Sequence, residues 1–413
     1  DLYAYCGAFP GAEAGEIFSA RVSFEELEAD RYRLNRYADG TFLNAEYLEG
    51  YSYRGESESL EFRLYRLRME LSRRLRFYLP KAAAGLEAAM LLGDKTHLEE
   101  RVEDSFRIAG VSHLLAVSGL HVSLLCGLLV SEWDVRRRFS RPRILLQAGL
   151  LVFYMALIGF PVSAVRAGCV FLITLLGRFL IQPPDTLTSM GLVALVLGMQ
   201  NAYAPCDLGF QLSFGAVLGV QAASSISRWE DRSLFPRAET ERGEWLRSLG
   251  LQALGTLQCT ILATMATLPV LLAHNMTASG VSVLTNLLVV WMLRPALILG
   301  ILVVILSVLP ILLPCVKAFS LLLALWLNAM YAIVEWCAAL PAARLALPEK
   351  YALFVLAVLG ILAILFWKLR RMVWYLPAAL LCAGAAIALG IRLEYGVVRI
   401  AVVGTAGNGC IVL

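Results

Sequence analysis

The 413-residue sequence is poor in histidine, in charged side chains and in paired cysteines. It has four histidines, none of them after residue 274, and no two have the i, i+2 or i, i+4 spacing typical of a metal site. The nine cysteines are scattered without a CxxC pair, so neither a zinc site nor a disulfide framework is expected. The sequence also lacks a phosphate-binding loop motif, and we expect no cofactor.

The low content of charge indicates a membrane protein. Charged residues make up 16% of the chain and apolar residues 59%, whereas soluble domains carry about 25% charged residues. We therefore predict a polytopic α-helical membrane protein with about ten transmembrane helices. Their expected ranges are 112–130, 144–160, 165–181, 187–204, 208–227, 249–274, 281–309, 316–340, 351–367 and 373–391. The net charge of +4 is too small to indicate nucleic-acid binding by itself.

The N-terminal part has a different pattern. Residues 1–56 are predicted to form a small β-rich region, with a strand at 16–24 and a hairpin around Asp39-Gly40. Its tyrosines either offer a stacking platform for single strands or pack a small barrel. Because the chain begins at Asp1, without Met or a signal peptide, we expect a fragment or a trimmed chain.

Residues 57–111 are predicted to form amphipathic helices at the membrane surface, at 60–81 and 96–109. The first has seven basic and two acidic side chains, a local charge of +5, and suits anionic lipid headgroups or other phosphates. Pro80 should end it. The apolar stretch 82–93 reaches only about 18 Å at ~1.5 Å per residue, too short to cross a hydrocarbon core of about 30 Å.

Residues 112–392 form the predicted transmembrane domain, and 393–413 a short C-terminal β segment of two strands around a glycine turn. Basic residues cluster in the loops 131–143 and 368–372, which should therefore be cytoplasmic. Counting crossings from either loop places both termini outside.

The mouth of the first apolar segment holds a dense group of polar residues. His113, Ser118 and His121 lie among leucine and valine, where an unpartnered polar group is costly. At helical spacing Ser118 and His121 share one face, with His113 two turns earlier on a similar side. Gly119 invites close helix contact or a break. The group therefore either lines a polar path or joins helices together.

Other polar residues stand at the ends of later segments. Arg166, Asp207 and Gln211 should lie near the outer face, as should His113, either as a shared vestibule or as an Arg–Asp pair that holds helix ends. Ser213 follows Gln211 on the same segment. Segment 281–309 is expected to break at Arg294-Pro295, and a broken helix near Asn286 is typical of a transport path. The alternative is a kinked helix whose arginine reaches the interface.

Several of these stretches together resemble the ComEC family, membrane channel proteins of bacterial competence. The motifs are HLLAVSGLHV at 113–122, LGD at 92–94, GFPVSAVRA at 159–167, DLGFQLSF at 207–214, ATLP at 266–269 and TNLL at 285–288. The resemblance implies an inner-membrane channel that conducts single-stranded DNA into the cytoplasm during natural transformation, and an OB-like N-terminal region. It implies as partners single-stranded DNA, the lipid bilayer, a DNA receptor and a cytoplasmic helicase, and it leaves a homo-oligomer open.

The family's C-terminal metallo-β-lactamase-like domain would begin within 393–413. Val402 or Val403 stands where its first aspartate would be, and the sequence ends before a histidine-rich metal run, so we expect no enzyme. Two other classes remain open. A secondary transporter of a small anion would use Arg294, Pro295 and a histidine, and an intramembrane hydrolase would use Ser118 with His121 as base.

The basic loops yield a prediction on orientation. In an otherwise cysteine-free chain, Arg138→Cys should resist a membrane-impermeant thiol reagent added to intact cells and react after the membrane is opened. Efficient labelling from outside would reverse the assigned topology.

The scarcity of histidine yields a second prediction. The purified 413-residue chain should bind no stoichiometric zinc or manganese and cut no DNA, because 392–413 offer Glu394 as their one carboxylate. Metal analysis and a nuclease assay measure this. Manganese-dependent release of nucleotides, abolished by a chelator and absent from a mock purification, would contradict it.

Overall fold

A computed structural model describes residues 4–6, 16–27, 33–38, 40–117, 119, 121–122, 124, 141–180, 185–230, 241–274, 279–340, 343, 401–403 and 410–412. The chain divides into two compact units. The first comprises residues 1–219 and 279–343, and the second comprises 220–278 and 344–413. The loop 368–372, most of the loop 131–143 and the two last expected crossings lie outside the described residues.

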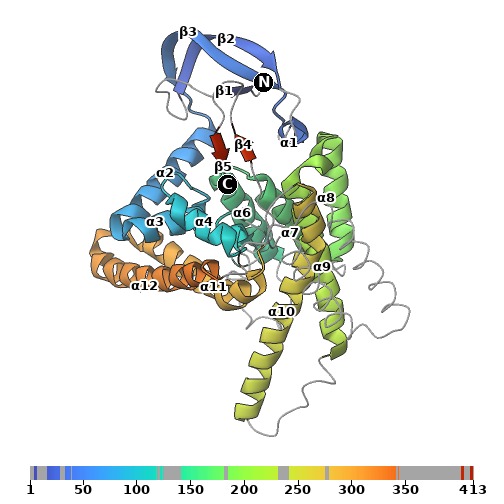
Figure 1. Ribbon diagram of the computed structural model, residues 1–413. Helices are drawn as coiled ribbons and strands as arrows, with labels where there is room; N and C mark the ends of the chain where they lie inside the picture. Colours follow the sequence, from blue (N-terminus) through green and yellow to red (C-terminus); the bar gives the residue numbers. More distant parts are fainter. Residues whose placement is uncertain are drawn as a thin grey trace. The chain divides into compact units, whose positions relative to one another are not determined.

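The N-terminal residues of the first unit form a three-stranded sheet. Its strands are β1 (Ala4–Cys6), β2 (Glu16–Glu26) and β3 (Leu43–Glu56), in the order β1-β3-β2. Strand β3 pairs in parallel with β1 and antiparallel with β2, which is the long two-stranded ribbon of Figure 1. The strand expected at 16–24 is confirmed.

The hairpin expected around Asp39-Gly40 is wrong. The residues before it form helix α1 (Arg33–Ala38), and Gly40 ends this helix instead of turning a hairpin. Gly40 has a φ of 80° and donates its N–H to the carbonyl of Tyr37 (3.1 Å), while the N–H of Thr41 reaches Arg36 (2.9 Å). These two bonds are the Schellman pattern of a helix C-terminus. A glycine with positive φ suits either structure, so the dipeptide alone does not distinguish them.

Helix α2 (Leu60–Tyr78) confirms the first amphipathic helix, with Leu79 extended ahead of Pro80. Its leucine stripe is only partly covered, since Leu60 is 73% exposed whereas Leu75 is fully buried. Helix α3 (Lys81–Glu87) continues directly as a π-helix, η1 (Ala88–Leu92), and every side chain from 83 to 92 is buried. Helix α4 (Glu100–Ile108) begins four residues later than expected and buries Val102 and Phe106.

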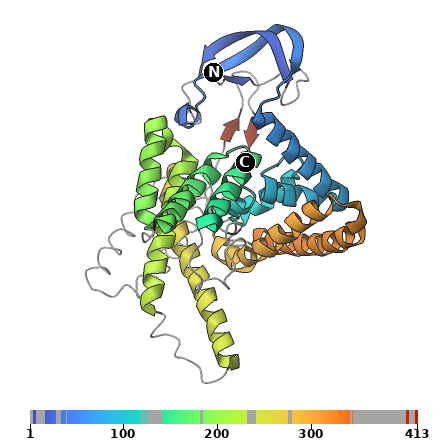
Figure 2. The same cartoon turned by 180° about the vertical axis from the view of Figure 1, so that it is seen from behind.

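Helices α11 (Ser282–Leu306) and α12 (Leu313–Ala338) form an antiparallel pair that lies side by side in both ribbon views (Figures 1 and 2). The short turn η5 (Pro310–Leu312) connects them. The break expected at Arg294-Pro295 is absent, because α11 runs through Pro295 without interruption. Proline removes one backbone bond, to the carbonyl of Trp291. The packing of α12, including a bond of 2.9 Å from Trp326 Nε1 to the Met292 carbonyl, supports both halves as one helix.

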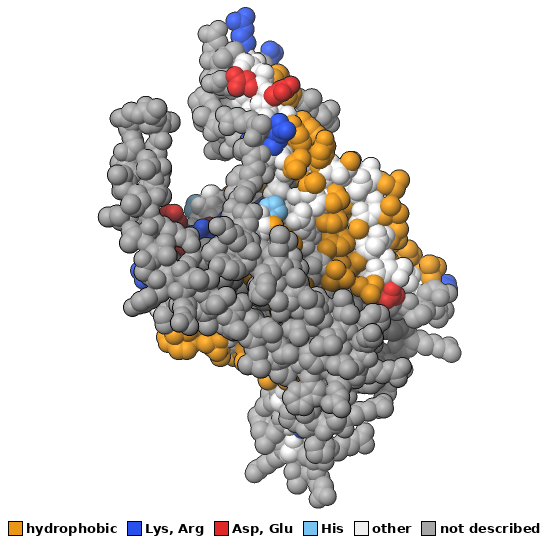
Figure 3. Space-filling model, turned by 45° about the vertical axis from the view of Figure 1, so that its right-hand side comes forward, with side chains coloured by type: hydrophobic (Ala, Val, Ile, Leu, Met, Phe, Trp, Pro, Cys, Tyr) orange, Lys and Arg blue, Asp and Glu red, His pale blue; other side chains and the backbone are white. Residues whose placement is uncertain are grey.

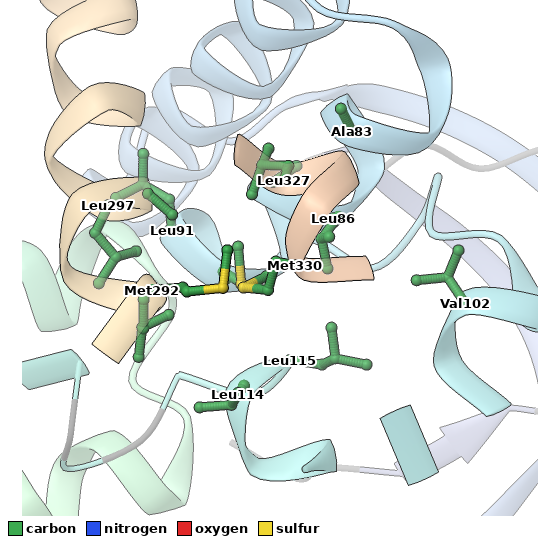
Figure 4. Packing of buried hydrophobic residues seen from close by; sticks show 14 of the residues in the cluster. Ala83, Leu86, Leu91, Val102, Leu114, Leu115, Met292, Leu297, Leu327 and Met330 are labelled. Carbon is green, nitrogen blue, oxygen red and sulfur yellow. The ribbon is translucent and has the colours of Figure 1, made fainter. Parts of the chain in front are cut away.

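The central elements bury a common apolar core (Figure 4). Helix α3 and η1 contribute Leu86 and Leu91, α11 contributes Met292 and Leu297, and α12 contributes Leu327 and Met330. Val102 of α4 and the pair Leu114 and Leu115 point into the same cluster. The segment 82–93 is thus an interior element of the first unit.

The remaining helices are α6 (Arg141–Leu157), α7 (Val162–Phe179), α8 (Thr186–Gln200), α9 (Leu208–Glu230) and α10 (Glu241–Ala273), with a short 3-10 turn η4 (Ala204–Cys206). In the second unit, β4 (Ala401–Val403) pairs antiparallel with β5 (Cys410–Val412).

Four helices in the described part of the chain are long and apolar enough to cross a membrane: Val162–Phe179, Gly250–Leu271, Ser282–Leu306 and Leu313–Ala338. They coincide with four of the ten expected crossings. Shorter apolar helices occupy Ile144–Leu157, Thr186–Gln200 and Leu208–Ser224. Hydrophobic side chains gather in broad bands on the surface shown in Figure 3, as a lipid-facing surface requires.

Candidate functional site

The continuous helix expected through the segment 113–122 is wrong, because the described residues of this segment are interrupted. It opens with a 3-10 turn, η2 (Ser112–Leu114), and Val117 lies outside any helix before helical structure resumes at Gly119. The hydroxyl of Ser163 donates to the carbonyl of Val117 (2.9 Å), which takes up an acceptor that a continuous helix would use internally. His113 retains solvent-accessible surface, whereas His121 is fully buried. Ser118 lies outside the described residues.

The start of helix α7 holds this interrupted segment at two points. The bond from Ser163 is the first. The second is a close approach at Gly119, where an added methyl group would lie 3.1 Å from Cβ of Ala167. Gly119 thus serves close helix packing, which is one of the two roles expected from the sequence.

Arg68 of α2 joins two further turns to the same place. Its guanidinium donates to the carbonyl of Gly93 (2.7 Å) and to that of Ile158 (3.1 Å). A methyl group on Gly93 would lie 3.4 Å from Cγ2 of Val117, so the end of η1 contacts the interrupted segment directly. The stretches 92–94, 113–122 and 159–167 therefore meet around one arginine. We call this contact region the motif junction.

Arg68 is a site residue that was not expected from the sequence, in which it is one of several basic residues of an amphipathic helix. The position of Arg68 relative to the leucines of this helix does indicate a special role. Arg68 stands four residues after Leu64 and three before Leu71, on the leucine face of the helix and not opposite it. A charged residue on the apolar face of a helix indicates a buried partner.

The side chains of Arg166 and Asp207 form a buried ion pair, with 3.1 Å between Nη1 and Oδ2 and exposed fractions of 5% and 17%. The same Asp207 oxygen accepts the backbone N–H of Phe210 (2.6 Å) and so caps α9. Gln211 Nε2 donates to the Pro205 carbonyl (3.0 Å) and Ser213 Oγ to that of Phe210 (3.2 Å). The Arg–Asp pair expected as one of two alternatives is present.

Helix α11 approaches the motif junction through its first turn. An added methyl group on Gly110 would lie 2.6 Å from Cβ of Ser282, so any side chain at this position would displace the start of α11. Asn286, one turn further, is 7% exposed. Arg294 is exposed, which agrees with an arginine that reaches an interface. No hydrogen bond or ion pair within the described ranges joins Asn286 or Arg294 to Arg166 or His121.

These features define the class of protein to which the chain belongs. Apolar helices of membrane-spanning length, with their ends fastened by buried polar bonds, make the chain a multi-pass membrane protein.

Comparison with known proteins gives the family. Residues 90–372 match the family described as Competence protein, and the chain belongs to this family. The matched range contains all of the motif junction except Arg68.

Three relatives illustrate the similarity. ComE operon protein 3 of Bacillus subtilis (strain 168) is 29% identical over 259 residues, covering 61% of this chain and 30% of the relative. Recombination protein 2 of Haemophilus influenzae is 26% identical over 177 residues, 40% of this chain and 22% of the relative. An uncharacterized protein of Mycoplasma pneumoniae, the MG316 homolog, is 31% identical over 121 residues, 29% of this chain and 31% of the relative. The chain thus spans less than a third of each relative, and no solved structure matches it.

The buried pair yields a prediction on stability. Arg166→Met leaves Asp207 without its cationic partner and should destabilise the protein by about 3 kcal/mol, measured as thermal unfolding in detergent. The exposed Arg294→Met is the matched control and should change stability by less than about 0.5 kcal/mol. Equal unfolding temperatures for the two variants would show that the pair contributes nothing.

Proposed function

We propose that this chain is the membrane channel part of a competence system, which conducts single-stranded DNA across the inner membrane into the cytoplasm during natural transformation. Membership of the Competence protein family over 90–372 carries the proposal. The name of the Bacillus subtilis relative, ComE operon protein 3, supports it. We also propose that both termini face outward and that a DNA receptor and a cytoplasmic helicase act with the channel.

The proposed DNA path runs beside the motif junction. His113 and the fully buried His121 would both line this path. The pair Arg166 and Asp207, with Gln211 and Ser213, would hold the ends of α7 and α9 at the path's border. Polar groups buried in a membrane domain are costly, and a transport path is their usual reason.

Observations on α11 bear on the anion-transporter alternative. A discontinuous helix at Pro295 was its main support, and α11 is continuous. Asn286 and Arg294 therefore enter the proposal only as residues near the path. The hydrolase alternative keeps His121 as a base but has no further support from the described residues.

A transport assay separates the alternatives. Cells that lack the gene should fail to take up labelled DNA and should recover uptake when the gene is restored, while uptake of labelled small anions is the same in both. Loss of anion uptake with normal DNA uptake would replace the proposal by the transporter.

A substitution in the segment 113–122 gives a second prediction on DNA uptake. His121→Leu, although better tolerated by an apolar environment, should reduce DNA uptake at least about tenfold while protein amount and membrane insertion stay normal, because its ring lines the path. Transformation frequency and immunoblots measure this. Normal transformation at normal protein level would show that His121 only joins helices.

Ser118→Ala is the companion variant. It should have a milder effect than His121→Leu, because a hydroxyl that lines a path is more easily replaced than a catalytic nucleophile. An equal and complete loss in both variants would favour the hydrolase.

A further inference from the structure

Glu87 is a carboxyl group in the interior of the first unit. It is fully buried, at the last residue of α3, and its sequence neighbours Leu86 and Ala88 are buried as well. Neither of its carboxyl oxygens has a hydrogen-bond partner among the described residues. Its position also matters, because the π-helix η1 begins at the next residue, and π-helical turns are frequent at functional sites.

Gly300 of α11 provides the space that this carboxyl occupies. A methyl group added at Gly300 would overlap Oε1 and the carboxyl carbon of Glu87. The carboxyl therefore lies directly against the backbone of α11, in a gap that only glycine leaves open.

The charged groups on the surrounding elements are engaged elsewhere. Helix α3 packs against α2, η1, α11 and α12. On α2, Arg68 binds the Gly93 and Ile158 carbonyls and Arg74 binds Glu70 and the Ser307 carbonyl. The charged groups of α11 and α12 are Arg294 and Lys317, which are exposed, and Glu335, which pairs with Arg101.

Tyr154 and Asp94 are two further titratable groups in this part of the first unit, and neither is a cation. Tyr154 of α6 is close enough to interact electrostatically with Glu87, but its hydroxyl donates to the Leu91 carbonyl (2.9 Å). Asp94, after η1, accepts from Ser72 (2.5 Å) and Thr96 (2.7 Å). Among the described residues, none therefore supplies Glu87 with a counter-charge.

The two buried acids are thus in opposite states. Burial would raise the pKa of Asp94, but the hydrogen bonds from Ser72 and Thr96 outweigh this and lower it below its ordinary value. Burial raises the pKa of Glu87 to about 8, with no opposing hydrogen bond. Asp94 is then charged at neutral pH, whereas Glu87 retains its proton.

We propose that Glu87 and Gly300 form a proton-binding site, and that the contact between α3 and α11 requires the carboxyl to hold a proton. When the proton leaves, the buried negative charge has no partner, so the carboxylate must gain water or a cation by separating α3 from α11. Proton release and helix separation are then one event.

Both elements of this contact lead to the motif junction. The α3–η1 segment ends at Gly93, beside Val117 of the junction, and α11 begins at Ser282, beside Gly110, which lies shortly before the segment 113–122 in the chain. A separation of the two helices at Glu87 would shift both supports of the segment 113–122. Under the proposed function, on which this last step rests, protonation of Glu87 would set the shape of the DNA path.

The first test measures thermal unfolding of the purified full chain in lipid nanodiscs between about pH 5 and pH 9. The folded protein keeps a proton that the unfolded chain releases above its ordinary pKa of ~4.3. Stability should therefore fall as the pH rises from there toward 8 and then level off. Glu87→Gln should flatten this fall, whereas the matched control Asp94→Asn should retain it. An unchanged fall in Glu87→Gln would overturn the proposal.

The second test addresses the contact itself and covers the case in which Glu87→Gln does not fold. Gly300→Ala should be strongly destabilising alone, and the double variant Glu87→Ala/Gly300→Ala should recover much of the loss, because the new methyl group then fills the vacated space. Destabilisation that adds up in the double variant would show that the two residues do not meet.

The third test detects the proton directly. The infrared band of a protonated carboxylic acid should be present in the wild-type protein at neutral pH and missing in Glu87→Gln or, if that variant does not fold, in the double variant. A band unchanged by the substitution would refute the site. None of these measurements involves DNA. They can therefore refute the proton-binding site without bearing on the proposed DNA channel, and the DNA-uptake assay can refute the channel without bearing on the proton-binding site.

Discussion

The motif junction depends on two hydrogen bonds that the guanidinium of Arg68 donates. A buried backbone carbonyl without a donor is costly in a membrane domain, where water does not reach it. Arg68 supplies donors to two such carbonyls, Gly93 and Ile158, that belong to turns 65 residues apart in the chain. Because the planar guanidinium fixes both bonds at once, it also fixes the distance between η1 and the turn that precedes α7.

The other helix ends follow the same rule with different donors. Ser163 donates a hydrogen bond to the Val117 carbonyl where the segment 113–122 is interrupted. Asp207 both pairs with Arg166 and caps α9. Each polar group thus performs a structural task at a helix end. A path that runs beside these bonds would have walls held by fixed contacts.

Glu87 stands out against this background. Arg68, Arg166, Asp94 and Asp207 each have at least one hydrogen-bond or ion-pair partner, whereas the described residues offer neither carboxyl oxygen of Glu87 a partner. Proteins rarely bury an unpaired carboxyl without a functional reason, because its ionised form is strongly disfavoured there. Its carboxyl lies at the contact between α3 and α11, against Gly300.

The sequence by itself determined the class and the family. Composition is enough to establish a membrane protein, and the leucine period and Pro80 are enough to place helix α2, because these signals are local. Only the tertiary structure decided which partner each polar residue has. Arg74 meets the carbonyl of Ser307, 233 residues away, and no spacing rule within one helix reports such a contact. For the same reason the continuity of α11 at Pro295, the interruption at Val117 and the helix before Gly40 were not predictable. Each is a case in which the local preference permits two structures and packing against a distant segment selects one.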